Sequence, residues 1–199
     1  MVLSNKHKLI FILLCFFSEI FANNFDFKNY SVADGLSEST INVIHEDRNG
    51  FIYLGTENGL MMFDGIKFFN YKMNIFDDFS ILGNNIISLY EDKKGYIWVG
   101  TELGLSKLDP RFKTFKRIEH NEEYDLKNVK KIIEDENGNI WIQCSSGIFR
   151  YIISENKILC ISCGDFNEIT SFSKIFGTQS NNVIICSFSD IFKYDAGKD

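Results

Sequence analysis

A segment that recurs three times without a gap constrains the fold of this chain more than any other feature. The copies are INVIHEDRNGFIYLGTENGLMMFDG, IISLYEDKKGYIWVGTELGLSKLDP and VKKIIEDENGNIWIQCSSGIFRY. Their shared glycine occurs at Gly50, Gly95 and Gly138, so the spacing is 45 and then 43 residues. This period is typical of four-stranded β-propeller blades and is longer than that of TPR or ankyrin repeats. The repeat therefore predicts tandem blades.

A weaker fourth copy appears when the 43-residue step is taken once more. Ile175 and Asp190 then align with Ile132 and Gly147 of the third copy. Its turn glycines are replaced by Asn181 and Asp190, and both residue types tolerate left-handed backbone better than most. We therefore expect an all-β fold, a partial β-propeller of about four tandem four-stranded antiparallel blades, at approximately residues 38–75, 83–120, 126–162 and 168–199.

Each clear copy carries an Asp-x-x-Gly turn after its first strand. An aspartate at the first position accepts backbone N–H bonds and a glycine at the last position eases the exit, which suits a type I turn. The pairs are Asp47 and Gly50, Asp92 and Gly95, and Asp135 and Gly138. Because they recur once per copy, we interpret these residues as turn builders.

The strand after each turn is apolar on both faces. In a sheet with one solvent-exposed face, apolar and polar residues would alternate along the strand. Its aromatic residue is Trp98 in the second copy, Trp141 in the third and Tyr53 in the first. Blades stacked face to face would cover both faces, and each aromatic residue would contribute about 2–3 kcal/mol by burial. We expect these residues to fill the space between blades.

Further glycines punctuate the repeat. Gly55 and Gly100 end the aromatic strand, where a glycine indicates a bulge or a close backbone approach, and Gln143 breaks this rule in the third copy. A hairpin signal follows at Asn58-Gly59, with counterparts that end in Gly104 and Gly147.

The N-terminus has the pattern of a secretory signal peptide. Lys6 and Lys8 precede the apolar run Leu9–Phe17, which is too short to span a bilayer. Ala22 is a small residue suited to the position before cleavage, so we expect a signal-peptide helix in residues 1–22 and a mature propeller from 23 to 199. A periplasmic location follows from this expectation.

The charge of the mature chain argues against nucleic acid as a partner. Removing residues 1–22 takes away two lysines and one glutamate, so the formal net charge changes from −6 to −7. Binding to nucleic acid depends on basic surfaces that neutralise phosphates. The sequence contains no cluster of basic residues that would supply one.

On these residues the chain resembles the two-component regulator propeller repeat. The pattern D-x-x-G-x-x-x-x-G-T-x-x-G-L is matched from Asp47 to Leu60 and again from Asp92 to Leu105. Tyr53 stands where the family favours tryptophan, and Gln143-Cys144 replaces Gly-Thr in the third copy. The resemblance covers roughly Phe27 to Tyr194 when the fourth copy is included.

The resemblance implies the N-terminal periplasmic part of a hybrid two-component sensor histidine kinase. In that family, blades outside the membrane precede an Ig-like module, a membrane helix and a kinase core, none of which this sequence matches. An extracellular carbohydrate or another small ligand is the partner that the family implies. We expect a non-catalytic sensor module without a cofactor or a metal, connected to a membrane only through segments absent from this chain.

Four blades are too few to close a seven-bladed ring. We therefore expect a fragment whose open blade faces are covered by missing blades or by a homodimer partner. Exposed phenylalanine and isoleucine side chains on such faces predict poor solubility or self-association.

Two alternative functions stay open. A propeller-type lyase would need an acid–base histidine and usually metal ligands, and the chain has only His7, His45 and His120. His45-Glu46-Asp47 superficially suggests a phosphoacceptor box, but it ends a predicted strand rather than lying on a helix. The other alternative is a non-catalytic protein-binding scaffold, which sequence does not separate from a sensor.

Four mature cysteines and a set of repeated acids are the remaining candidates. Cys144, Cys160, Cys163 and Cys186 lack the spacing of a regular zinc site, so buried thiols are favoured, with a disulfide open in an oxidising periplasm. Glu57 and Glu102 could line a ligand site at the propeller mouth together with the turn aspartates, although their repetition favours a structural role. The ligand-binding residues themselves cannot be named from the sequence.

Overall fold

The computed structural model describes residues 27–118, 125–163, 174–178, 182–186 and 190–194, with the side chains of Ser162 and Cys163 excepted. The expected signal peptide lies outside these residues. The chain divides into two units, Met1–Tyr30 and Ser31–Asp199. In the first unit the Lys28 ammonium lies 4.8 Å from the Tyr30 ring centroid. All the strands among the described residues belong to the second unit.

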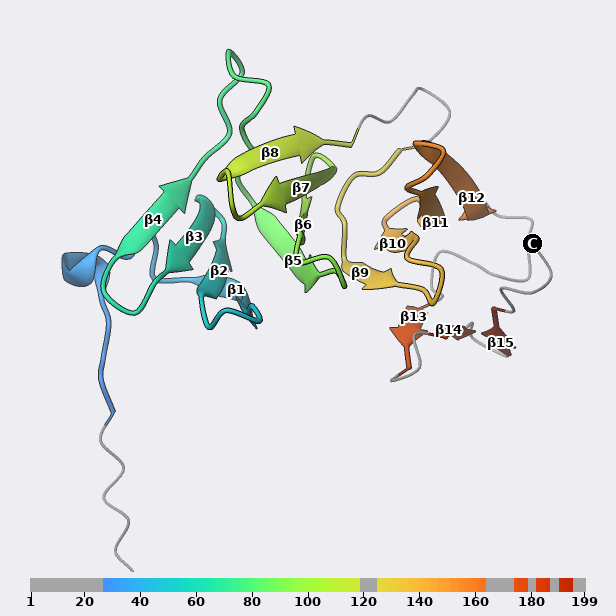
Figure 1. Cartoon of the computed structure of the whole chain (residues 1–199), viewed down its shortest axis with the longest axis horizontal. Coiled ribbons are helices and arrows are strands. Elements are labelled where there is room, and N and C mark those ends of the chain that lie inside the picture. The colour runs from blue at the N-terminus through green and yellow to red at the C-terminus, as the bar shows by residue number, and fades with distance from the viewer. Residues whose placement is uncertain (1–26, 119–124, 164–173, 179–181, 187–189, 195–199) are drawn as a thin grey trace, which may run out of the picture. The chain divides into compact units, whose positions relative to one another are not determined.

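Four antiparallel sheets follow one another along the second unit, and each sheet is built from consecutive strands (Figure 1). A 3₁₀ turn, η1 (Val32–Asp34), precedes them and was not predicted. Blade 1 contains β1 (Ile41–Glu46), β2 (Ile52–Thr56), β3 (Gly59–Phe63) and β4 (Phe68–Tyr71). Blade 2 contains β5 (Ile86–Glu91), β6 (Ile97–Thr101), β7 (Leu105–Asp109) and β8 (Thr114–Arg117). Blade 3 contains β9 (Lys131–Glu134), β10 (Ile140–Cys144), β11 (Gly147–Ile152) and β12 (Lys157–Cys163).

Blade 4 differs from the expected four strands. Its described part has three, β13 (Lys174–Gly177), β14 (Val183–Cys186) and β15 (Ile191–Lys193). β13 and β14 begin 43 residues after β9 and β10. The weak copy therefore forms a sheet, and a fourth strand is not among its described residues.

The turn after the first strand has the same geometry in blades 1 to 3. In each, one carboxylate oxygen of a buried aspartate accepts the N–H groups of the residues two and four places later, at 2.8–3.0 Å. The closing glycine has φ near +83°, a conformation that residues with a Cβ rarely adopt. The aspartates are Asp47, Asp92 and Asp135, and the glycines are Gly50, Gly95 and Gly138.

The hydrophobic core lies between blades. Tyr53 packs with Ile86, Ile97 and Val99 of blade 2. Trp98 packs in the same way against β9 and β10 of blade 3, and Trp141 packs against blade 4. All three aromatic residues are at most 1% exposed. The first strands β1, β5, β9 and β13 also contact one another in sequence, which is the arrangement of inner strands in a propeller.

Close approach between blades explains two of the strand glycines. A Cβ at Gly55 would lie 2.6 Å from Ile86 Cγ2 and 2.6 Å from Val43 Cγ1. A Cβ at Gly100 would lie 2.2 Å from Ser88 Oγ and 2.6 Å from Val129 Cγ1. Real Cβ atoms do not approach so closely, so the next blade sits where a larger residue would be.

Gln143 occupies the equivalent position in blade 3. Its Oε1 accepts the N–H of Ile175 in β13 at 3.4 Å. The side chain therefore fills the position that is bare in blades 1 and 2, and it binds the first strand of blade 4 directly.

The next hairpin is closed by a side chain as well as by its glycine. Thr56 Oγ1 donates to the carbonyl of Gly59 at 2.9 Å, and Thr101 Oγ1 donates to that of Gly104 at 3.0 Å. In blade 3 the thiol of Cys144 lies 3.6 Å from the carbonyl of Gly147. A thiol is a weaker donor than a hydroxyl, so this hairpin is the least firmly closed of the three.

A recurring set of hydrogen bonds, here called the turn clasp, joins the turn of one blade to that of the next. The backbone N–H of the basic residue after the turn aspartate donates to a glutamate of the following blade. Its cationic side chain then reaches two carbonyls of the following turn. In the first clasp Arg48 N binds Glu91 Oε2 at 3.1 Å, and its guanidinium binds the carbonyls of Asp92 and Lys93.

The second clasp repeats this arrangement between blades 2 and 3. Lys93 N binds Glu134 Oε2 at 2.9 Å, and its ammonium lies 3.2 and 3.4 Å from the carbonyls of Asp135 and Glu136. Arg48 adds an ion pair from Nε to the Glu91 carboxylate.

Candidate ligand groove beside the outer strand of blade 2

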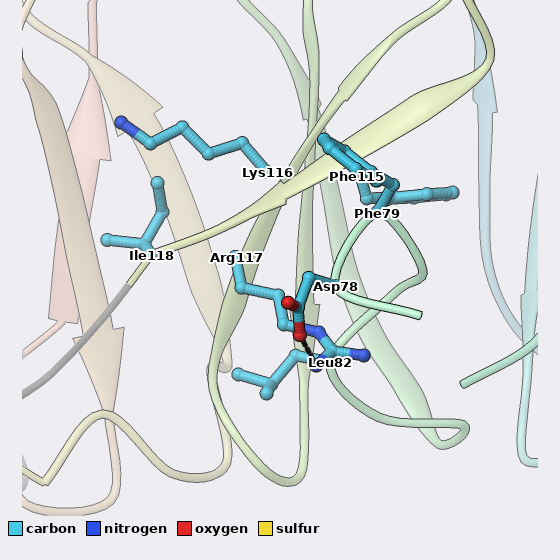
Figure 2. Close-up of a pocket in the computed structure, with 7 residues that line it drawn as sticks. All are labelled: Asp78, Phe79, Leu82, Phe115, Lys116, Arg117 and Ile118. Atoms are coloured by element: carbon cyan, nitrogen blue, oxygen red, sulfur yellow. Dashed lines mark ion pairs between the residues drawn. The ribbon is translucent and has the colours of Figure 1, made fainter. Parts of the chain in front are cut away.

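A groove of about 530 Å³ lies between β8 and the connection from blade 1 to blade 2. Figure 2 shows side chains from both segments around it. Its size is within the range of small-molecule sites. The lining residues are Asp78, Phe79, Leu82, Phe115, Lys116, Arg117 and Ile118.

The connection, residues 72–85, is held in one conformation by its own polar side chains. Asn74 N donates to Ser80 Oγ at 2.9 Å, and the Ser80 hydroxyl lies 2.9 and 2.8 Å from the carbonyls of Asn74 and Asp77. Asn84 Oδ1 accepts the N–H of Met73 at 2.8 Å, which closes the base of the loop. The loop is therefore an ordered wall of the groove.

Arg117 ties this loop to β8. Its Nε donates to the carbonyl of Ser80 at 3.1 Å, and its Nη2 donates to the carbonyls of Asn74 and Asp77, both at 3.0 Å. Phe115 N also donates to the carbonyl of Phe79 at 2.9 Å, so the loop covers part of the free edge of β8. Two residues of β8, Arg117 and Phe115, thus donate hydrogen bonds to four carbonyl groups of the loop.

The groove combines an aromatic surface with charged groups. The Phe79 side chain is 68% exposed, whereas Phe115 is buried in the core between blades 1 and 2. The fully accessible Asp78 carboxylate lies 3.8 Å from Arg117 Nη1. Lys116 is exposed and its ammonium lies 3.3 Å from Asn156 Oδ1. An aromatic face with a few polar groups is the usual composition of a small-molecule site.

A smaller hollow of about 170 Å³ adjoins the groove. It shares Lys116, Arg117 and Ile118 with the groove and adds Tyr151 and Asn156 of blade 3. Tyr151 donates its hydroxyl to Asn156 Oδ1 at 2.6 Å, and burial raises the pKa of the tyrosine. Lys116 and Arg117 therefore border both hollows.

The predicted acids and histidine lie away from the groove. Glu102 Oε2 accepts the N–H of Asn85 at 3.0 Å, so it supports the end of the connecting loop, whereas Glu57 is exposed on a hairpin. His45 lies between blades 1 and 2, with Nε2 3.7 Å from Glu91 Oε2. His7 and His120 lie outside the described residues. No group of three or more His, Cys, Asp and Glu side chains suited to a metal ion occurs in the described part of the chain.

The cysteines are of two kinds. Cys160 is disulfide-bonded, whereas Cys144 and Cys186 are free thiols. Cys144 is 1% exposed, and burial raises its pKa. The sequence favours buried thiols for all four cysteines and leaves a disulfide open. For Cys160 the first expectation is wrong, because this cysteine forms a disulfide.

The groove could not be found from the repeat because its residues belong to the connection between two copies and to the variable outer strand. A signal was nevertheless present. The connection contains NIFDDF, in which three apolar residues lie outside any strand, and Ile75, Phe76 and Phe79 are all more than two-thirds exposed. Apolar side chains that a loop displays to solvent indicate a binding surface.

Consecutive four-stranded sheets stacked face to face define a β-propeller architecture. The family model of the two-component regulator propeller matches residues 35–58 and 80–102. These stretches contain the first two Asp-x-x-Gly turns and the strands beside them. Two stretches of the chain thus match the two-component regulator propeller repeat, and they lie in blades 1 and 2.

Known proteins with related sequences or structures are much longer. Histidine kinase P4 of Formosa agariphila is 42% identical over 59 residues, which are 30% of this chain and 4% of that protein. The extracellular domain of a putative hybrid two-component system from B. thetaiotaomicron has a TM-score of 0.60 and 26% identity, over 76% of this chain and 21% of that one.

Two further solved structures share the fold alone. The extracellular domain of another putative hybrid two-component system from B. thetaiotaomicron has a TM-score of 0.54 and 16% identity, over 86% of this chain and 30% of that one. PorZ, a surface component of the type-IX secretion system of Porphyromonas gingivalis, has a TM-score of 0.56 and 18% identity, over 79% and 25%. The chain spans less than a third of each of these structures.

No helix within residues 27–118, 125–163 and the later described stretches is long and apolar enough to cross a membrane.

Proposed function

We propose that this chain is an extracytoplasmic, non-catalytic recognition module of a two-component sensor, and that the groove beside β8 binds its ligand. The repeat family and the likeness to extracellular domains of hybrid two-component systems support the sensor assignment. The groove itself supports the ligand-binding part. An ordered loop that displays Phe79 above a charged strand is the observation on which this part of the proposal rests.

A carbohydrate is the ligand that we propose. The exposed ring of Phe79 offers a flat apolar face to the C–H groups of a sugar ring, while Asp78 and Lys116 offer an acceptor and a donor for hydroxyl groups. The ligand would then bias the arrangement of blades 1 and 2, because it would contact their connection and β8 together.

Calorimetric titration of the secreted chain with a panel of neutral oligosaccharides tests this proposal. Phe79→Ala and Lys116→Ala should each weaken binding roughly tenfold, which corresponds to about 1.4 kcal/mol. Phe112→Ala is the matched control, because Phe112 is 72% exposed and does not line the groove. Binding that survives Phe79→Ala and Lys116→Ala would contradict the groove as the site.

A protein-binding scaffold is the second candidate, and one observation favours it. Ile75, Phe76 and Phe79 form an exposed apolar surface on a loop whose backbone is fixed by Arg117 and Ser80. A folded chain that binds no oligosaccharide, but whose adjacent gene encodes a secretion component, would favour this candidate over the sensor.

A further inference from the structure

The side of blade 1 that faces away from blade 2 has the chemistry of a surface between two blades. Residues at equivalent positions of the repeat differ sharply in exposure along the chain. Ile44 is 65% exposed, its counterpart Leu89 packs into the core between blades 1 and 2, and Ile132 of blade 3 is 4% exposed. Each later blade is covered on this side by the blade before it.

The second strands show the same difference. Ile52 and Leu54 of blade 1 are partly exposed, whereas their counterparts in blades 2 and 3 are completely buried. Those counterparts are Ile97 and Val99 in β6, and Ile140 and Ile142 in β10. In blade 1, residues 31–40 give only partial cover, for example Ser37, whose Oγ lies 2.8 Å from Met61 Sδ.

Glu46 is the polar part of this surface. It occupies the position of Glu91 and Glu134, which are the acceptors of the two turn clasps. The Glu91 side chain is 11% exposed and Glu134 is 5% exposed, whereas Glu46 is exposed and its side chain makes no hydrogen bond or ion pair in the described part of the chain. Its counterparts are both held by a blade that lies before them.

Within the chain, the basic donor of one blade is always paired with a glutamate acceptor on the next blade. Arg48 faces Glu91 and Lys93 faces Glu134, but after blade 3 both halves are absent. Glu136 stands where a basic donor would be, and Gly177 stands where the acceptor would be. In both clasps the acceptor meets a donor from the preceding blade, so Glu46 indicates a donor that these four blades do not supply.

We infer that this surface of blade 1 seats a further blade of the same repeat, which carries arginine or lysine directly after its turn aspartate and completes a third clasp with Glu46. The donor's N–H would bind the Glu46 carboxylate, and its cation would bind the carbonyls of Asp47 and Arg48. Blade 4 of a second copy fits this surface less well, since Thr178-Gln179 replaces the Asp-Arg pair. The inference does not depend on the proposed ligand.

Duplicating blade 1 tests it within the full chain. A second copy of residues 41–85 inserted directly before Ile41 places Asn85 ahead of Ile41, as Asn85 naturally precedes Ile86 at the equivalent position. The inserted Arg48 then faces the original Glu46. A double-mutant cycle of inserted Arg48→Ala with original Glu46→Gln should show coupling of roughly fivefold in the unfolding equilibrium constant. Glu57→Gln, an exposed glutamate on the neighbouring hairpin, should show none.

A labelling experiment gives a second readout that does not depend on stability. A cysteine introduced by Ile44→Cys should react rapidly with a thiol reagent in the natural chain, because Ile44 is largely exposed. The inserted blade should slow this reaction at least tenfold. If the first insert does not unfold cooperatively, a copy of residues 86–128, whose donor is Lys93, replaces it at the same junction.

Two results would overturn the inference. One is an unchanged labelling rate at Ile44→Cys with either folded insert. The other is self-association of the natural chain that Glu46→Gln abolishes, because the occupant of the surface would then be a second copy of this chain.

Discussion

Trp98 donates its indole N–H to Asp92 Oδ2 at 2.8 Å, so the aromatic residue of β6 binds the turn that precedes its own strand. Trp141 makes the same bond to Asp135 at 3.0 Å. In blade 1 the aromatic residue is Tyr53, and both its hydroxyl and Asp47 Oδ2 are buried without a partner. Burial, followed by the charge of Asp47, raises the pKa of Tyr53.

Tyr53→Trp should therefore stabilise the protein. An indole N–H would satisfy Asp47 Oδ2, and a hydrogen bond to a charged acceptor contributes about 1.5–3 kcal/mol, from which the strain of a larger ring must be subtracted. We expect a net gain of about 1 kcal/mol in urea unfolding. Tyr53→Phe is the control, because it removes one unpartnered hydroxyl without supplying a donor. A Tyr53→Trp chain less stable than the Tyr53→Phe chain would show that the indole does not reach the carboxylate.

Gly55→Ala should destabilise the protein by about 1–3 kcal/mol, because the added methyl group would overlap Ile86 and Val43. Gly177→Ala is the matched control, since its nearest neighbours, atoms of Ile133, lie at 3.8–3.9 Å. Combining Gly55→Ala with Ile86→Ala should cost less than the sum of the two changes. Additive costs in urea unfolding would argue against overlap with Ile86.

The repeat alone predicts the tandem sheets and their face-to-face stacking, because the turn aspartates, the strand glycines and the two-sided apolar strands each carry a local physical requirement. What it does not predict depends on contacts across blades. Gln143 departs from the pattern and binds Ile175 N, a contact that no local rule contains. Arg48 and Lys93 look like ordinary surface residues until the following turn is placed beside them.

The candidate groove is harder to predict from the sequence than the fold is. Its loop is ordered by Ser80 and by Arg117, which is 37 residues away in the chain. The three apolar residues of NIFDDF point to this connection, but the local sequence does not show that the connection is ordered. Only the placement of β8 against the loop shows that order.

Cys144 should react slowly with iodoacetamide in the folded protein. The thiolate is the reactive form, and burial both shields the sulfur and raises its pKa. Cys186, which is partly exposed, serves as the internal comparison. We expect its alkylation, followed by mass spectrometry of the two peptides, to be at least about tenfold faster. Equal rates would mean that blade 3 opens readily in solution.

Glu134 should make the stability depend on pH. Burial is the main cause that raises its pKa, against a smaller opposing effect of the Lys93 N–H. Between its ordinary and its raised pKa the folded chain therefore holds more protons than the unfolded chain, so the free energy of unfolding falls as pH rises.

Glu134→Gln removes this titration and keeps an oxygen for Lys93. Its stability relative to the natural chain should be greater near pH 7 than near pH 4. Urea unfolding across this range measures the difference, and the exposed Glu136→Gln is the control. A difference that does not change with pH would show that Glu134 ionises alike in both states.

Arg117→Lys should loosen the wall of the groove while blade 2 stays folded. A lysine ammonium cannot reproduce the fork that binds the carbonyls of Asn74, Asp77 and Ser80, because its donors radiate from one atom. Hydrogen exchange of the Asp77 and Ser80 amides should become roughly tenfold faster, while amides in β6 keep their protection. Arg111→Lys is the control, since Arg111 pairs with Asp109 on the turn between β7 and β8. If the loop amides exchange at the natural rate in Arg117→Lys, then Ser80 and Asn74 suffice to order the loop without the guanidinium.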